Sequence, residues 1–163
     1  MPKKYLKKVL PSHEKIKEQK YLKIFGNSLY KRSIWSLKRK SVIYAVFLGI
    51  FVSCLPIPLQ MLLVTFLAII LNVNLPISFA LLWINNPITI PFIFYAEYKI
   101  GAFLLNAPNN IEFNFESMYE NLGDIAIYLY LGSVVLGLVL GLVCMFVTNY
   151  LWIWYVKKQR KRS

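Results

Sequence analysis

Charged residues are almost absent from two long stretches of this chain. Residues 42–105 contain only Glu97 and Lys99, and residues 125–156 contain no charged residue. Apolar stretches of this length are typical of segments that lie in a lipid bilayer rather than in the core of a globular domain. A length of 163 residues suits one small domain, so we expect no separate soluble catalytic domain. The sequence therefore predicts an all-α integral membrane protein with a single membrane domain over residues 41–156.

Lysine and arginine are concentrated at the two ends of the chain. Of the 19 Lys and Arg residues, 13 lie in residues 1–40 and 5 in residues 157–162, whereas residues 106–124 have none. Basic loops stay on the cytoplasmic side of a membrane. We therefore predict a basic cytoplasmic flank over 1–40, an acidic external loop over 106–124 and a basic cytoplasmic tail over 157–163. In this interpretation the basic residues behind the net charge of +12 orient the chain in the membrane and contact anionic lipid. We therefore expect no nucleic-acid partner.

Two prolines divide the first apolar block. Pro56 and Pro58 lack a backbone N–H, and each pushes the preceding residue out of helical geometry. As helices, residues 42–55 would cover about 21 Å and residues 59–71 about 20 Å. Neither length crosses a hydrocarbon core of about 30 Å. We predict a re-entrant helical hairpin over 41–71, with one long kinked span as the alternative.

A second break, at residues 85–89, lies inside the next apolar run. We predict that residues 75–105 form one broken transmembrane helix that crosses from inside to outside. The ten residues that follow Pro87 would cover about 15 Å as a helix. This rise predicts that Glu97 and Lys99 reach the outer interface, where their charge is tolerated.

The last apolar block has the length and the flanks of a simple transmembrane helix. Tyr130 to Tyr150 covers about 30 Å, aromatic residues flank both ends, and basic residues follow. We predict a transmembrane helix over 125–156. Gly137 and Gly141 form a GxxxG pattern, which favours close approach of another helix, either within the chain or in a dimer.

The two breaks are the candidate site. Broken backbone at membrane depth is tolerated only where it is packed in protein or lines a wet cavity. Two interrupted segments in succession are typical of a transport site at a repeat interface. A half-helix starting after the second break would also point its positive end at the site. The predicted substrate-binding residues are Pro56, Pro58, Gln60, Asn85, Asn86, Pro87 and Thr89. The alternative is a packed scaffold in which the polar groups of the breaks satisfy one another.

No pattern of catalytic or metal-binding residues is found in the sequence. His13 is the only histidine, and no nucleophile–base spacing, HExxH, P-loop or GxGxxG occurs. Cys54 and Cys144 lack the spacing of a zinc site or a disulfide framework. The carboxylates of the predicted loop recur at Glu112, Glu116, Glu120 and Asp124. This period places them on one helical face, which we interpret as solvated surface. We predict no enzymatic activity, no cofactor and no metal.

Three runs together resemble a known family: LPIPLQM from Leu55 to Met61, VNLP from Val73 to Pro76, and WINNPIT from Trp83 to Thr89. In combination they resemble the bacterial "domain of unknown function two-thousand-sixty-two" family over about residues 41–105. Asn72 departs from the family, in which a basic residue is expected. The resemblance implies a small integral membrane protein, sometimes joined to glycosyltransferase domains, with no settled activity. With the charge bias, it implies a multi-pass protein of the bacterial inner membrane with both termini in the cytoplasm.

The function hypotheses follow from the breaks and from this resemblance. The leading hypothesis is membrane transport or translocation of a lipid or envelope precursor through a polar site built from the two helix breaks. The alternative is a structural membrane adaptor that recruits or stabilises an envelope-synthesis enzyme. A membrane-embedded enzyme that acts through Glu97 or the loop carboxylates is the third. Because so few segments make a thin wall around any cavity, we also expect a homo-oligomer, a parallel dimer, in contact with membrane lipids.

Overall fold

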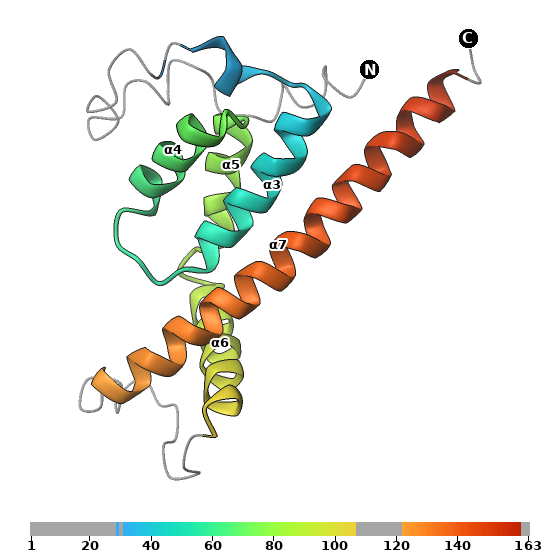
Figure 1. Ribbon diagram of the computed structural model, residues 1–163. Coiled ribbons are helices and arrows are strands. Elements are labelled where there is room, and N and C mark those ends of the chain that lie inside the picture. The colour runs from blue at the N-terminus through green and yellow to red at the C-terminus, as the bar shows by residue number, and fades with distance from the viewer. Residues whose placement is uncertain (1–28, 30, 107–121, 161–163) are drawn as a thin grey trace.

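The computed structural model describes residues 29, 31–106 and 122–160, and every regular element in these residues is helical (Figure 1). In chain order the elements are η2 (Arg32–Trp35), α3 (Arg39–Cys54), α4 (Gln60–Leu71), α5 (Leu75–Leu81), η3 (Leu82–Ile84), α6 (Ile90–Leu104) and α7 (Leu122–Arg160). The prediction of an all-α chain is confirmed. α7 runs beside α3, whose other side carries α4 and α5, and α6 packs on the first half of α7. Predicted features that lie outside the described residues are His13, Glu112, Glu116 and Glu120.

The first apolar block folds back on itself. α3 ends where Leu55 adopts an extended conformation ahead of Pro56, and α4 begins after the left-handed residue Leu59. Beyond the end of α4, the Asn74 N–H donates to the carbonyl of Ser41 in the first turn of α3, at 3.3 Å. The block is therefore a helical hairpin and not one long kinked helix. That this hairpin enters and leaves a membrane on the same side stays a prediction.

Two asparagines shape the turn between α4 and α5. Asn72 caps α4 in the left-handed conformation, with φ 53°, which asparagine adopts more readily than most residues. Asn74 caps α5, since its side-chain oxygen accepts a hydrogen bond from the Ile77 N–H at 3.0 Å, with Pro76 in the first turn. Asn74 also donates to the carbonyl of Ser36 at 3.1 Å. The turn thus holds α5 against the segment that precedes α3.

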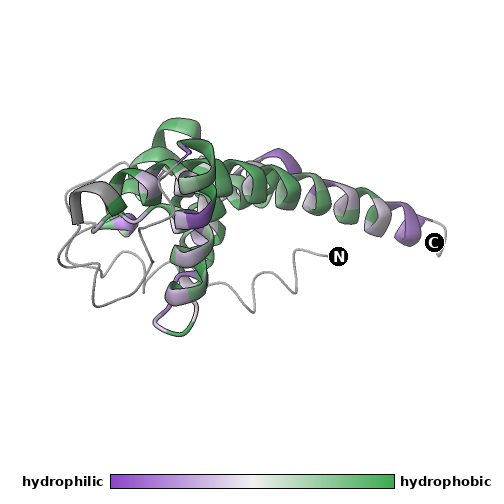
Figure 2. Cartoon of the chain, turned by 90° about the horizontal axis from the view of Figure 1, so that it is seen from below, coloured by the Kyte–Doolittle hydropathy of each residue, from purple (hydrophilic) through white to green (hydrophobic). Residues whose placement is uncertain are grey.

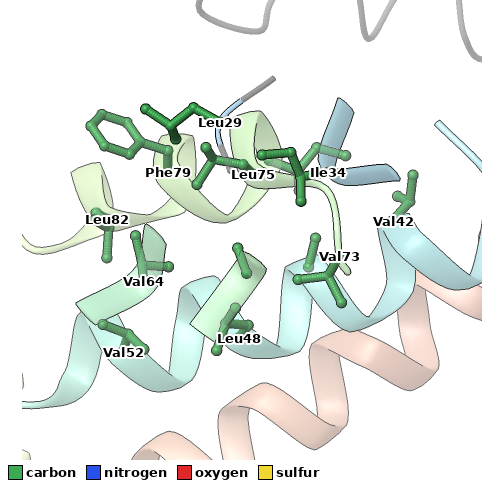
Figure 3. Packing of buried hydrophobic residues seen from close by; sticks show 13 residues of the cluster. Leu29, Ile34, Val42, Leu48, Val52, Val64, Val73, Leu75, Phe79 and Leu82 are labelled. Atoms are coloured by element: carbon green, nitrogen blue, oxygen red, sulfur yellow. The ribbon is translucent and has the colours of Figure 1, made fainter. Parts of the chain in front are cut away.

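An aliphatic core joins α3, α4 and α5 (Figure 3). Its members include Val52 from α3, Val64 from α4 and Leu75 from α5, all without exposed surface. Leu29 and Ile34 also belong to this core, and the Trp35 indole donates to the Leu29 carbonyl at 2.8 Å. The folded unit therefore extends into the segment that was predicted to be a basic flank.

The glycine pattern of α7 packs against α3. A Cβ added to Gly137 would lie 3.2 Å from the Phe51 ring and 3.3 Å from the Cys54 side chain. A Cβ added to Gly141 would lie 2.9 Å from the Phe47 ring. The GxxxG pattern is thus used within the chain, which was one of the two alternatives left open by the sequence.

α6 and α7 cross with their backbones in contact. A Cβ added to Gly101 would collide with the Tyr128 carbonyl, and one added to Gly132 would collide with the Glu97 carbonyl. Glu97 has no exposed surface at this crossing. That Glu97 reaches the outer membrane interface stays a prediction, but its side chain is buried inside the protein and not on its surface. Lys99 is exposed, and its ammonium lies 5.6 Å from the centre of the Tyr95 ring.

Large apolar side chains cover much of the outer surface. On α6 the exposed fraction is 75% for Phe92 and 82% for Phe103, and on α7 it is 64% for Phe146. Figure 2 shows α7 as hydrophobic along most of its length, with a hydrophilic C-terminal end. Among the described residues, Ile125–Arg160 is the one stretch long and apolar enough to cross a membrane by itself.

Candidate functional site

The two breaks meet around two cavities. The first cavity, about 340 Å³ in volume, is lined by Pro56, Ile57, Pro58, Gln60, Asn85, Phe94, Ile125, Ala126, Leu129 and Tyr130. The second, about 480 Å³, is lined by Ile57, Leu59, Gln60, Met61, Leu62, Leu82, Trp83, Asn85, Asn86 and Pro87. Gln60 and Asn85 come from different breaks, and both line both cavities. Of the predicted site residues, only Thr89 lines neither of these two cavities.

The first break is defined by two short-range hydrogen bonds, one left-handed residue and one distant hydrogen bond. The Ile57 N–H donates to the Leu55 carbonyl at 2.8 Å, and the Gln60 side-chain amide donates to the same carbonyl at 2.6 Å. Leu59 has a φ of 66°, a left-handed conformation that is uncommon for a branched, non-glycine residue. From α7, the Tyr130 hydroxyl donates to the Pro56 carbonyl at 3.0 Å. α7 therefore fixes the geometry of this break.

The second break closes on itself. The Asn86 side-chain oxygen accepts hydrogen bonds from the Ile88 N–H at 2.9 Å and the Thr89 N–H at 3.1 Å. The Thr89 hydroxyl in turn accepts from the Asn86 N–H at 3.1 Å and donates to the Ile84 carbonyl. This closed turn leads directly into α6, which has Thr89 at its N-cap position and Pro91 in its first turn. The polar side-chain groups of Asn86 and Thr89 thus form hydrogen bonds within the local turn.

Asn85 differs from its neighbour. Its backbone N–H donates to the Leu82 carbonyl at 3.1 Å, but its side-chain oxygen is buried and has no hydrogen-bond partner. A buried polar atom without a partner costs about 1–3 kcal/mol. Because this side chain lines both cavities, it is a candidate ligand-binding group of the breaks.

The walls contain residues that the sequence did not point to. Tyr130 was interpreted as part of an aromatic belt, yet its hydroxyl binds the first break and its side chain lines the first cavity. Phe94 and Leu129 belong to a small cluster between α6 and α7 and line the same cavity. Trp83 lines the second cavity and is 72% exposed. Trp83 is the first residue of the WINNPIT motif, and in the sequence only the family resemblance points to it.

The lining determines what these cavities accept. Apolar and aromatic side chains dominate, and the polar side-chain groups are the amides of Gln60, Asn85 and Asn86, the Tyr130 hydroxyl and the Trp83 indole N–H. No charged residue lines either cavity. Nor does any group of three or more His, Cys, Asp or Glu among the described residues have the geometry of a metal site. Volumes of this size with a few convergent polar groups are typical of small-molecule sites.

The comparisons with known proteins bear on this arrangement. The family of uncharacterized proteins conserved in bacteria (DUF2062) matches residues 22–161. The chain belongs to this family. The DUF2062 match extends the resemblance from the two break motifs to α7 and to the core residues Leu29 and Ile34. No curated protein and no solved structure matches this chain.

Proposed function

We propose that this DUF2062 protein binds the polar part of a lipid or lipid-linked envelope precursor between its two helix breaks and moves it across the membrane. One observation carries the proposal. Gln60 and Asn85 come from separate breaks and line the same two cavities, and the Asn85 oxygen there has no partner. Two adjacent breaks that share a cavity are the arrangement expected of a transport site.

The proposal includes a location in the bacterial inner membrane. The long apolar stretch of α7 and the exposed apolar side chains of α6 support it. In the proposed topology the α3–α4 hairpin is re-entrant, and α5 to α6 form the broken span that crosses the membrane. α7 returns, so both termini lie in the cytoplasm, as the Lys and Arg distribution requires.

The ligand class follows from the lining of the cavities. Amide groups and a hydroxyl bind neutral polar atoms such as ester carbonyls, sugar hydroxyls or phosphate-ester oxygens. The surrounding apolar side chains suit acyl or isoprenoid chains, and bare ions find no charged partner there. A lipid with its headgroup inserted between the breaks meets both requirements.

A second copy of the chain completes the proposed site. Three large apolar residues are exposed in and around the second break: Trp83, which lines the second cavity, at 72%, Ile88 at 80% and Phe92 at 75%. A parallel dimer that covers these side chains would close the open side of the cavity. It would also leave the GxxxG face of α7 on α3, where it packs within one chain.

The test is a translocation assay with matched variants. Purified protein is reconstituted into liposomes that contain a phospholipid with a fluorescent headgroup, and a membrane-impermeant reductant reports the exposed fraction over time. We expect the protein to accelerate movement between leaflets. Asn85→Leu should reduce the rate about tenfold, since one lost hydrogen bond of about 1.4 kcal/mol corresponds to this factor.

Asn149→Leu is the matched control. Asn149 also carries a buried side-chain oxygen without a partner, but it lies in α7 and lines neither cavity. The control should translocate the lipid at the wild-type rate. Equal rates for Asn85→Leu and the wild type would contradict the proposal, as would a wild-type protein that moves no lipid.

One observation favours the adaptor hypothesis. Asn86 and Thr89 satisfy each other within the second break, which is what a packed scaffold would do. Under this hypothesis the cavities are incidental, and the protein recruits or stabilises an envelope-synthesis enzyme. The adaptor would then co-purify with that enzyme from membranes, and Asn85→Leu would leave the association unchanged.

A further inference from the structure

Glu97 stands apart from the other polar residues of the described chain that are buried as whole residues, unlike the partly exposed Asn85 and Asn149. Those residues all make hydrogen bonds: Ser53, Thr65, Asn74, Ser78 and Ser133. Glu97 has no exposed surface, and neither of its carboxyl oxygens has a hydrogen-bond partner. A carboxyl group is therefore enclosed in the protein with nothing that binds it.

The crossing around Glu97 is unusually close. Gly132 of α7 packs against the backbone of Glu97, and one turn further along α6, Gly101 packs against the backbone of Tyr128. A side chain at either glycine would force the two helices apart. α6 and α7 thus meet at their closest points on the turn that carries Glu97 and on the next turn.

The groups that face Glu97 offer no positive charge. From α3, the Cys54 thiol lies within electrostatic range of the carboxyl group. On α7, Tyr128 packs edge-on against Tyr98, the neighbour of Glu97 in the sequence, with ring centres 6.0 Å apart, and the Tyr130 hydroxyl is engaged with the Pro56 carbonyl. The nearest cation in sequence, Lys99, is exposed and lies over the Tyr95 ring.

A negative charge on Glu97 is incompatible with this closed crossing. An ionised carboxylate that is buried without a counter-ion or hydrogen bonds costs several kcal/mol. The closed form therefore holds Glu97 as the neutral acid. Among the described residues, Glu97 belongs to no group of three or more His, Cys, Asp or Glu that could hold a metal ion. The proton is the ligand that fits.

We propose that Glu97 is a proton-binding site and that release of its proton separates α6 from α7. Separation would let water reach the carboxylate, which removes the cost of its charge. Phe94, one helical turn before Glu97, and Leu129, one turn before Ser133, line the first cavity. Proton release at Glu97 therefore changes the width of this cavity. The inference holds whatever ligand the cavity takes.

The separation is measurable as a distance between spin labels. In full-length protein with Cys54→Ala and Cys144→Ala, Lys99→Cys and Ile127→Cys place one label on the exposed side of each helix. The distance between the two spin labels is recorded in lipid nanodiscs from pH 5 to pH 9. We expect a single short distance at the acidic end and a growing population at a longer distance as the pH rises.

Two neutral substitutions make the test specific to Glu97. Glu97→Gln and Glu97→Met keep the length of the side chain but hold no proton that could be released, so both should show the short distance at every pH. Gly132→Ala, which inserts a methyl group into the backbone contact, should show the longer distance at every pH. A wild-type distance that is constant across this range would overturn the proposal. So would a pH dependence that persists in Glu97→Gln or Glu97→Met.

Discussion

The two breaks find hydrogen-bond partners for their backbone groups in opposite ways. The second break is closed by residues within it, since Asn86 and Thr89 bind each other and the surrounding N–H groups. The first break depends on a distant helix, because the Pro56 carbonyl is bound by Tyr130, 74 positions along the chain. The second break should therefore keep its shape when the helices shift. The first should change its shape whenever α7 moves.

The largest effect is expected from removing the side chain that closes the second break. Asn86→Ala deletes the acceptor of two backbone N–H groups and the donor to the Trp83 carbonyl. Loss of these hydrogen bonds, which leaves two backbone N–H groups without their acceptor, should lower the free energy of unfolding by about 2 kcal/mol. Thermal unfolding of the purified protein in mild detergent, followed by circular dichroism, measures the change.

Two controls define this first prediction. Thr89→Val removes the hydroxyl but leaves both hydrogen bonds that the Asn86 oxygen accepts, so it should cost less than Asn86→Ala. Asn149→Ala, at a buried oxygen without a partner, should cost less than either. An Asn86→Ala protein as stable as the wild type would show that the second break does not close itself.

A smaller effect is expected from loosening the first break. Tyr130→Phe removes the hydroxyl that donates to the Pro56 carbonyl at 3.0 Å and keeps the ring in the wall of the first cavity. The unfolding free energy should fall by about 1 kcal/mol, the usual worth of one hydrogen bond. Hydrogen–deuterium exchange should rise at residues 55–60 and stay unchanged at residues 85–89. Equal increases at both breaks would contradict the comparison.

In contrast to the two substitutions above, replacement of Leu59 by glycine is expected to raise the free energy of unfolding. Its left-handed backbone costs about 1–2 kcal/mol for a non-glycine residue, and its side chain is 61% exposed. Leu59→Gly removes this strain but adds freedom to the unfolded chain, so a net gain of about 0.5 kcal/mol is expected. Leu71→Gly, at a similarly exposed helical position, should instead destabilise by about 1 kcal/mol. Destabilisation by Leu59→Gly would mean that the leucine side chain makes contacts that outweigh the strain.

The same contrast explains how much could be predicted from the sequence. The positions of both breaks are encoded locally, by two prolines in one case and by an Asn-Pro-x-Thr motif in the other. The two helices on either side of the first break accordingly begin and end within about three residues of their predicted bounds, Arg39–Cys54 against 42–55 and Gln60–Leu71 against 59–71. Local propensity and proline geometry are enough for this level of structure.

The contacts between elements could not be predicted in this way. The place of Tyr130 on the first break and the burial of Glu97 both depend on how α6 and α7 cross. That crossing is set by glycines on both helices, and only the pair on α7 at Gly137 and Gly141 was recognised as a packing pattern. The close contact at Gly132 pairs with a single glycine, Gly101, on a helix distant in sequence. A periodic pattern along one helix does not reveal such a pair.

The smallest effect is expected in the chemical labelling of Cys54, which tests whether the two breaks are held in different ways. The Cys54 side chain is 5% exposed and packs against Gly137, so a membrane-impermeant maleimide should leave it unlabelled in sealed inside-out vesicles of a Cys144→Ser protein. Lys38→Cys, at an exposed position just before α3, reports full labelling in the same vesicles. Tyr130→Phe should raise labelling of Cys54, two residues from Pro56, whereas Thr89→Val should not, because the second break does not hold the first in place. Rapid labelling of Cys54 in the unaltered background would mean that water already reaches the first break, and the distinction between a self-closed break and one closed by α7 would then fail.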